Sequence, residues 1–311
     1  MRLVLSSSCQ VRSLRLMKWK LFRSNQSPTF QPVRLLSSAP ESGPVTPAPL
    51  SPTQLLAVHQ LLDHVAERQR QDFGHIVSDV KPDGSLITAC DRWSDATLVQ
   101  GLGEISPGEC TLSEEGDKRC PSTSAFWVVD PLDGTTNFAA GIPYWAISVA
   151  RFVDGQPMEA FLEIPSLKQR IVAIRGRGAW RNGKRLTTET RLAAGSACVS
   201  LCSRAIRVLQ RRHQEPFPGK IRLLGVASLN LVSVAMGQTV AALEATPKIW
   251  DLSAAWLVLS ELGCPVLWLR EDPTSLVPGR DLSDVGFPVL AASSEDQLTR
   301  LKPWGQSLLL S

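Results

Sequence analysis

The sequence predicts a mixed α/β protein whose first half is built on antiparallel strands and whose second half alternates strands with helices. Two observations carry this prediction. Between residues 144 and 183, short apolar runs are separated by tight-turn signals such as Asp154-Gly155 and Asn182-Gly183, which is typical of an antiparallel meander. From residue 197 onward, strand-like apolar runs alternate with helical ones, which is typical of an α/β arrangement.

The N-terminal segment has the composition of a targeting sequence. Residues 1–40 hold seven basic residues, eight serines and no Asp or Glu. An Arg-rich, Ser-rich and acid-free N-terminus is typical of an organelle transit peptide. We therefore expect residues 1–45 to be a transit peptide and linker, and residues 46–311 to be the functional domain. The alternative is a basic arm that stays on the mature protein.

The net charge of +4 belongs to this leader. Without its seven basic residues, the chain has 26 basic and 29 acidic residues, so we expect no nucleic-acid partner. No run approaches the roughly 18–20 apolar residues that span a bilayer, so we expect no membrane partner either. The seven cysteines form no zinc-type pattern and are expected to be mostly free thiols, and whether Cys110 and Cys120 form a redox switch stays open.

The first helix is expected to begin at Ser51-Pro52-Thr53, since apolar residues follow at helical spacing up to Val65. A turn at Asp83-Gly84 then precedes a second helix, which Asp91 is expected to open as its N-cap. Glu114 and Glu115 fall in the next loop. His59 and His64 on the first helix are interpreted as surface or packing residues.

A buried strand is predicted at Phe126 to Val129, four apolar residues without a polar break. Asp130-Pro131 is expected to end it, because proline cannot continue a central ladder. Asp133-Gly134-Thr135 then has the chemistry of a helix start. Two carboxylates therefore lie where a strand ends and a helix begins, a place suited to an anion and to hard cations.

The second half is expected to continue the alternation. Strands are predicted near 197–201, 222–225, 240–244, 266–269 and 289–290, and helices near 204–212, 227–236, 251–262 and 295–302. Asp251 stands at the start of the most apolar of these helices. Taken alone, it would be an N-cap.

Five carboxylates thus fall at the edges of elements: Asp91, Glu114, Asp130, Asp133 and Asp251. Each alone is more simply a cap, an Asx turn or a surface loop. Together, without histidine or cysteine, they form a ligand set that suits Mg²⁺ rather than zinc.

At this point the chain resembles the inositol monophosphatase family of Mg²⁺-dependent phosphatases. The family signature Asp-Pro-Ile/Leu-Asp-Gly-Thr-Thr-Asn-Phe is matched by Asp130–Phe138, and a second signature, which begins with Trp-Asp and ends with Ala-Ala, by Trp250–Ala255. A Glu-Glu pair precedes the first signature, as it does in the family. A further matching segment ends at Asp91. The matching substrate-side region begins at Arg222 and includes Glu244. The resemblance covers roughly residues 50–305.

The resemblance implies a layered α/β/α/β/α sandwich, shared with fructose bisphosphatase, and roles by position. Glu114, Asp130 and the Leu132 carbonyl would hold one Mg²⁺, while Asp130, Asp133 and Asp251 would hold a second. Glu114 and the Thr135 hydroxyl would orient the attacking water, with Asp91 accepting a hydrogen bond from Thr135. The amides of Gly134 and Thr135 would bind phosphate. On the substrate side, the contacting residues would be Asp133, Asp251, the Ala227 backbone and Glu244.

The resemblance also frames the alternatives. The expected activity is hydrolysis of inositol monophosphate or a similar sugar-like phosphate, and the nearest rival is a histidinol-phosphate phosphatase. A phosphoadenosine phosphatase or a fructose bisphosphatase is less favoured, because those usually carry Ser or Lys after the first signature threonine. A catalytically silent scaffold protein is the alternative of another class. Family members are often dimers, so a homodimer is expected. Together with the serine content of the leader, the resemblance favours the plastid, with the mitochondrion as the alternative.

Overall fold

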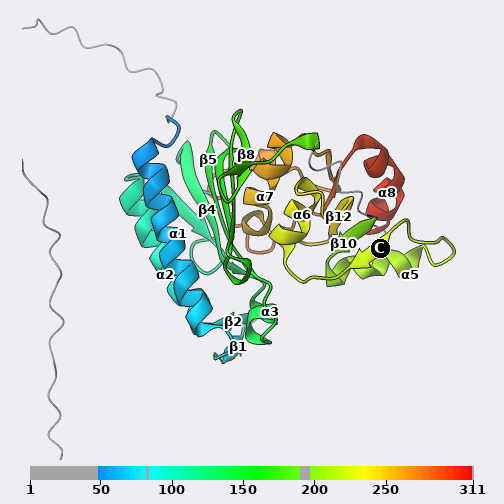
Figure 1. The fold of residues 1–311 in the computed structure, drawn as a ribbon, viewed down its shortest axis with the longest axis horizontal. Coiled ribbons are helices and arrows are strands. Elements are labelled where there is room, and N and C mark those ends of the chain that lie inside the picture. The colour runs from blue at the N-terminus through cyan, green and yellow to red at the C-terminus, as the bar shows by residue number, and fades with distance from the viewer. Residues whose placement is uncertain (1–47, 76, 82–83, 190–196, 310–311) are drawn as a thin grey trace, which may run out of the picture. The chain divides into compact units, whose positions relative to one another are not determined.

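Helices and sheets alternate in five layers (Figure 1). The computed structural model describes residues 48–75, 77–81, 84–189 and 197–309. In order, the layers are a helix pair, a seven-stranded sheet, a second helix pair, a five-stranded sheet and an outer pair of helices. The expected α/β/α/β/α sandwich is therefore confirmed. The expected transit peptide, residues 1–45, lies outside the described residues.

The first layer is the pair of helices α1 (Pro52–Asp72) and α2 (Ala89–Ile105). As the sequence predicts, Ser51 caps α1, because its hydroxyl accepts a hydrogen bond from the Gln54 amide (3.3 Å). Both helices pack their apolar faces on the large sheet; the buried side chains there include Leu62, Val65, Leu98, Trp127 and Phe161. No helix in the described ranges has the length and apolar content needed to cross a membrane.

The large sheet contains the predicted meander, which further strands extend on both sides. It comprises, in spatial order, β3 (Cys110–Ser113), β4 (Ala125–Asp133), β5 (Ala146–Val153), β6 (Gln156–Ile164), β7 (Gln169–Ile174), β8 (Gly178–Arg181) and β9 (Lys184–Arg185). All neighbours pair antiparallel except β3 and β4, which are parallel. Asp154 and Gly155 both have positive φ, as a two-residue hairpin turn requires.

Strand β4, which lies next to the edge strand β3, runs further than the sequence predicts. It continues through Pro131 to Asp133, and its pairing with β5 shifts between Asp130 and Asp133. Such a bulge takes residues out of the ladder, so the missing N–H of Pro131 breaks no sheet hydrogen bond. Side chains alternate along β4. Trp127 and Val129 face the first helix pair, while Phe126 and Val128 face the second.

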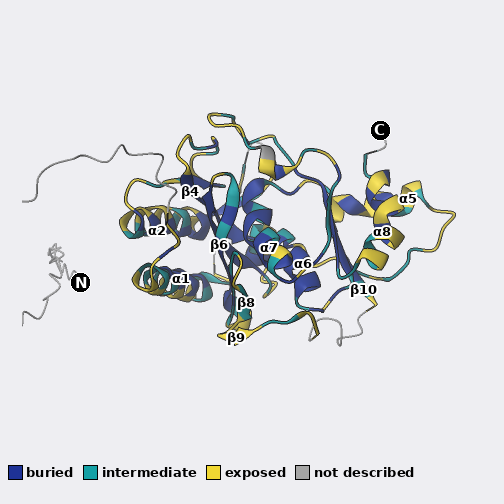
Figure 2. Ribbon diagram, turned by 90° about the horizontal axis from the view of Figure 1, so that it is seen from above, coloured by how far each residue is buried: buried dark blue, intermediate teal, exposed yellow. Residues whose placement is uncertain are grey.

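The second half encloses two buried helices, α6 (Ala227–Ala235) and α7 (Ile249–Glu261), between the two sheets (Figures 1 and 2). The small sheet has the order β11 (Lys220–Arg222), β10 (Cys198–Leu201), β12 (Ala241–Glu244), β14 (Val289–Ala292) and β13 (Val266–Trp268). β10 is parallel to β11 and β12, while the β12–β14 and β13–β14 pairs are antiparallel. The predicted alternation of strands and helices is confirmed.

The remaining elements are short or lie outside the two sheets. They are the hairpin β1 (Ser78–Val80) and β2 (Leu86–Thr88), helix α3 (Thr135–Ala139), the outer helices α5 (Arg207–Arg211) and α8 (Glu295–Ser307), and the 3-10 turns η1 (Pro165–Leu167), η2 (Ser203–Ile206) and η3 (Pro273–Ser275). α5 and α8 lie side by side and cover the outer face of the small sheet (Figure 2). Cys110 and Cys120 are both free thiols, Cys110 exposed and Cys120 buried.

Candidate active site

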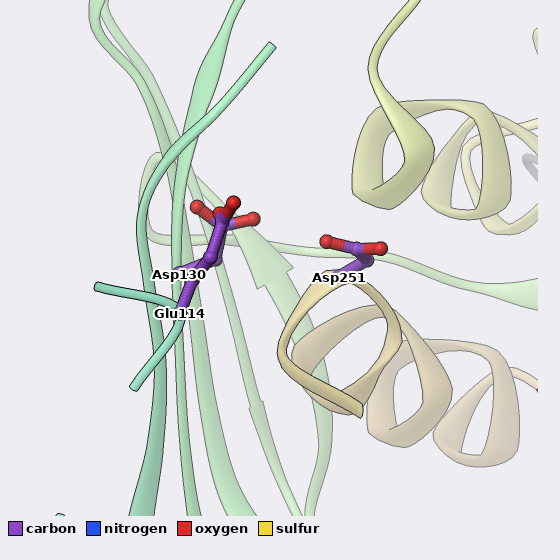
Figure 3. A group of neighbouring side chains, drawn as sticks. All are labelled: Glu114, Asp130 and Asp251. Atoms are coloured by element: carbon purple, nitrogen blue, oxygen red, sulfur yellow. The ribbon is translucent and has the colours of Figure 1, made fainter. Parts of the chain in front are cut away.

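Three carboxylates meet between the large sheet and α7 (Figure 3). Glu114 follows β3, Asp130 lies near the end of β4, and Asp251 lies in the first turn of α7. One oxygen from each lies within 4.8 Å of the others. The fold accounts for the meeting, because the alternation along β4 turns Asp130 toward the face that α7 covers.

Asp130 is the most deeply enclosed of the three, with 1% of its surface exposed. Its Oδ1 accepts a hydrogen bond from the Leu132 amide (3.0 Å), and its Oδ2 is buried without a hydrogen-bond partner. Burial, then the nearby charges of Glu114, Asp133 and Asp251, raise the pKa of Asp130 well above its usual value. A buried oxygen with negative neighbours and no donor is a position for a cation.

Asp251 enters the site from a helix position that the sequence analysis misassigned. Lys248, not Asp251, is the N-cap of α7, and Asp251 is the third residue of the helix. Its Oδ2 accepts a hydrogen bond from the Lys248 amide (2.7 Å). Burial, followed by the charges of Asp133 and Glu114, raises the pKa of the Asp251 carboxyl. The capping bond therefore fixes the carboxylate while it faces the other two (Figure 3).

Asp91 repeats this arrangement at the start of α2, so its predicted N-cap role is also wrong. Thr88 is the N-cap, and Asp91 Oδ2 accepts hydrogen bonds from the Thr88 amide (2.8 Å) and hydroxyl. Asp91 Oδ1 accepts the hydroxyl of Thr135 (2.8 Å). Burial raises the pKa of Asp91. The expected Thr135–Asp91 hydrogen bond is thus present in the structure.

Asp133 has a different environment from the three clustered carboxylates. Its Oδ1 accepts the Ala227 amide (3.3 Å) and its Oδ2 the Ser228 amide (2.7 Å), both from the first turn of α6. Burial raises the pKa of Asp133 to about 6, although these hydrogen bonds oppose the change. The expected contact of the Ala227 backbone with substrate stays a prediction, and in the structure the Ala227 amide donates a hydrogen bond to Asp133 Oδ1.

Gly134 is the N-cap that joins β4 to α3, and Thr135 is the first residue of α3. Gly134 has φ +100°, and a Cβ added to it would lie 2.8 Å from Val226 Cγ2, so glycine alone fits there. The Thr135 hydroxyl also lies 3.1 Å from the Leu132 carbonyl oxygen, which the sequence analysis expects to be a metal ligand. Both residues line the same pocket as the three carboxylates.

That pocket has a volume of about 190 Å³ and is bordered on one side by Ser85 and Leu86 and on another by Gly225. Glu244, expected to contact substrate, does not line it. Glu244 is only 2% exposed and accepts a hydrogen bond from Asn230 Nδ2 (2.8 Å). Burial raises its pKa to about 8. The structure therefore leaves Glu244 behind the pocket wall.

Lys81 is a site residue that sequence reasoning missed. Its Nζ lies 2.9 Å from Glu114 Oε1 and 2.5 Å from Glu115 Oε1. Burial lowers the pKa of Lys81, but the two carboxylates outweigh burial and the pKa is raised overall. A lysine before a turn carries no signal of this role, because only the fold brings the β1–β2 hairpin to Glu114.

These residues fit a hard divalent cation. The clustered donors are all carboxylate oxygens, which are the ligands that Mg²⁺ takes, with no histidine or cysteine among them. The unpartnered Asp130 Oδ2 and the raised pKa values of Asp130 and Asp251 show negative charge in excess of its local compensation. Lys81 compensates only the outer edge of the cluster, at Glu114.

Comparisons with known proteins agree with this fold. The profile of the inositol monophosphatase family matches residues 52–301. A histidinol-phosphatase of Mycobacterium tuberculosis is 33% identical over 227 residues, which cover 69% of this chain and 86% of the relative. An inositol-1-monophosphatase of Rhizobium meliloti is 32% identical over 204 residues, which cover 62% of this chain and 77% of the relative.

Solved structures show the same fold. An inositol monophosphatase of Thermotoga maritima superposes with a TM-score of 0.68 at 22% identity, covering 82% of this chain and 99% of the other. A staphylococcal inositol monophosphatase complexed with products superposes with a TM-score of 0.68 at 23% identity, covering 84% and 96%. The class is therefore that of phosphoric monoester hydrolases. Within that class, the chain belongs to the inositol monophosphatase family.

Proposed function

We propose that this phosphatase hydrolyses a small, sugar-like phosphate monoester in a Mg²⁺-dependent reaction, with inositol monophosphate as its leading substrate. The observation that carries the proposal is the buried, unpartnered Asp130 Oδ2 between the carboxylates of Glu114 and Asp251. Glu114, Asp130 and the Leu132 carbonyl would hold one Mg²⁺, and Asp130, Asp133 and Asp251 would hold a second. When bound, Mg²⁺ supplies positive charge to the phosphate oxygens and lowers the pKa of water.

Thr135 has the geometry to orient the attacking water. Because its hydroxyl proton is donated to Asp91 Oδ1, its oxygen lone pairs are left to accept a hydrogen bond from a water in the pocket. Asp91 is itself held by Thr88, so the pair is fixed before substrate arrives. Glu114 borders the same space and would accept the second proton of that water.

The pocket volume suits a compact ester. About 190 Å³ accommodates a phosphate group and part of a small polyol, whereas drug-sized ligands occupy pockets of roughly 300–1,000 Å³. Thr136, an exposed residue of α3, also lines this pocket and would lie beside a hydroxylated ring. In the proposed reaction, water attacks the phosphate directly, and no covalent phosphoenzyme forms.

Histidinol phosphate is the second candidate substrate. The observation in its favour is the 33% identity to the Mycobacterium tuberculosis histidinol-phosphatase, over 86% of that relative. Retention of every carboxylate of the site argues against the alternative of a catalytically silent scaffold.

The test is phosphate release by residues 48–311 with Mg²⁺ and with EDTA, using inositol 1-phosphate, histidinol phosphate, phosphoadenosine phosphate and fructose bisphosphate. A preference for inositol 1-phosphate of tenfold or more in kcat/KM (about 1.4 kcal/mol) supports the leading substrate. A tenfold preference for histidinol phosphate replaces it and leaves the metal site in place. Equal hydrolysis in EDTA contradicts the Mg²⁺ dependence.

We also propose, from composition and resemblance, that residues 1–45 direct the protein to the plastid and that the mature enzyme is a homodimer. A fluorescent fusion to residues 1–45 tests the first, and mitochondrial or cytosolic fluorescence would contradict it. Sedimentation of residues 48–311 tests the second, and a monomer at micromolar concentration would contradict it.

A further inference from the structure

Four arginines converge on a second pocket, which lies at the small sheet. Arg204 comes from η2, Arg207 and Arg211 from α5, and Arg270 from the segment after β13. We call this the arginine pocket. It has a volume of about 180 Å³, close to that of the catalytic pocket, and shares no lining residue with it. Ala245 and Thr246, just after β12, also line it.

Among the residues that the structure describes, none that lines the arginine pocket carries a carboxylate side chain. In the described part of the chain, none of its four arginines takes part in an ion pair. Two of them bind neutral acceptors: Arg204 donates to Thr246 Oγ1 (2.8 Å), and Arg211 donates to the carbonyls of Ser307 (2.5 Å) and Leu308 (3.0 Å). These bonds hold the guanidinium groups in place without neutralising their charge.

The spacing of three of these arginines places like charges next to one another, which destabilises the local helix. Positions 204, 207 and 211 follow one another at intervals of three and four, so their side chains share one helical face. Like charges at such spacing destabilise a helix by about 0.2–0.5 kcal/mol per pair. By contrast, the neighbouring Arg212 is ion-paired with Glu215 (2.6 Å). Unpaired positive charge at this density suits a negatively charged ligand.

The topology of the small sheet favours a ligand at the same place. β10 and β12 are parallel neighbours, and Arg204 and Thr246 follow their carboxyl ends. The helix after β10, α5, packs on the outer face of the sheet, whereas the helix after β12, α7, packs on the inner face. Adjacent strands whose connections leave on opposite faces open a crevice at their carboxyl ends, and open α/β sheets bind ligands there.

We propose that the arginine pocket is a second phosphate site, distinct from the catalytic pocket, which binds inorganic phosphate or the phosphate group of a small phosphate ester. Guanidinium groups match the oxygens of a phosphate dianion in charge and in paired hydrogen-bond geometry. The volume accommodates one phosphate group and a short organic part, and excludes a longer molecule from full enclosure.

The site adjoins the segment that positions a catalytic carboxylate. Arg204 binds the Thr246 hydroxyl, and two residues later the Lys248 amide holds Asp251 (2.7 Å). A phosphate that takes the Arg204 guanidinium from Thr246 would therefore act on the backbone that leads to the metal cluster.

The test is calorimetric titration of inorganic phosphate, and separately of glycerol 3-phosphate, into residues 48–311 in EDTA. Without metal, the clustered carboxylates repel phosphate, so binding under these conditions reports the arginine pocket whatever the catalytic substrate is. We expect saturable binding that Arg207→Ala and Arg270→Ala each weaken at least tenfold (about 1.4 kcal/mol). Arg207→Lys keeps the charge and is expected to lose less.

Arg181→Ala is the matched control, since it removes one exposed positive charge from β8, outside the pocket. It should leave the phosphate affinity unchanged, and circular dichroism should show that all variants stay folded. Asp130→Asn should also bind phosphate in EDTA as the natural chain does. Absence of binding, or binding that none of the pocket variants weakens, would overturn the proposal. Binding of a single-stranded oligonucleotide without binding of phosphate would overturn it as well.

Discussion

The catalytic pocket clusters negative charges and the arginine pocket clusters positive charges, and the two clusters lie at different depths in the protein. Asp130 in the first is 1% exposed, whereas the arginines of the second lie at the surface. Depth decides how strongly like charges repel, because water screens surface charges and the interior does not. The buried cluster therefore needs its counter-ion far more than the exposed one, and substitutions in the two pockets should differ in size accordingly.

The largest expected effect is the loss of turnover in Asp130→Asn. The amide keeps the shape of the side chain but removes the charge at the centre of the cluster, so kcat/KM in Mg²⁺ should fall about 10³-fold. Phosphate release from inositol 1-phosphate measures it. Asp117→Asn, which neutralises an exposed carboxylate near Glu114, is the control and should keep activity. Near-normal Mg²⁺-dependent turnover in Asp130→Asn would show that Asp130 is not a ligand of the catalytic metal.

The next effect concerns the hydroxyl that orients water. Thr135→Ala should lower kcat by about 10²-fold, because the contact that holds the water is lost, while KM changes little. Thr135→Ser retains the hydroxyl and its bond to Asp91 and should stay within about tenfold of the natural enzyme. Equal losses in the alanine and serine variants would assign Thr135 a packing role instead.

A smaller effect is the pH dependence of stability without metal. Burial raises the folded-state pKa of Asp133 to about 6 and of Glu244 to about 8, and raises that of Asp130 and Asp251, whereas unfolded carboxyls titrate near 4. The folded protein thus holds more protons between these values, and its free energy of unfolding should fall as the pH rises from about 5 to about 8. Urea unfolding in EDTA measures this slope.

Two comparisons sharpen that result. Mg²⁺ should stabilise the domain more at the upper end of this pH range, because it binds the ionised carboxylates. Asp130→Asn should be more stable than the natural chain there in EDTA, since it relieves the repulsion. Stability that rises with pH in EDTA would contradict the raised pKa values.

The smallest effect is expected in the arginine pocket. In phosphate-free buffer, Arg207→Ala should change the free energy of unfolding by no more than about 0.5 kcal/mol, because the repulsion it removes is exposed to water. Urea unfolding beside Asp130→Asn compares the two pockets directly. A large stabilisation by Arg207→Ala would show that the arginine charges repel one another as strongly as the buried carboxylates do.

Much of the fold and the centre of the site could be predicted from the sequence. The apolar run before Asp130 and the turn signals after Tyr144 placed β4 and the meander, because a buried strand and a tight hairpin have strong local signatures. The helix roles of Asp91 and Asp251 could not be predicted. Both are N3 residues that accept the N-cap amide, and local sequence does not separate that role from the N-cap itself.

What the sequence could not show depends on long-range contacts. Lys81 reaches Glu114 only because the β1–β2 hairpin folds over the site, and the α6 amides reach Asp133 across 94 residues. Glu244 matched a family position, yet burial among Asn230 and its neighbours keeps it from the pocket. The arginines at 204, 207 and 211 are visible in the sequence, but their meeting with Arg270 is not.

The most direct test of the central assignment is calorimetric titration of Mg²⁺ into residues 48–311 and into the Asp130→Asn variant near pH 8, where the carboxylates favour the ionised form in the presence of metal. We expect saturable Mg²⁺ binding to the natural chain and none to the variant. Identical Mg²⁺ isotherms for the two proteins would show that Glu114, Asp130 and Asp251 are not the metal site.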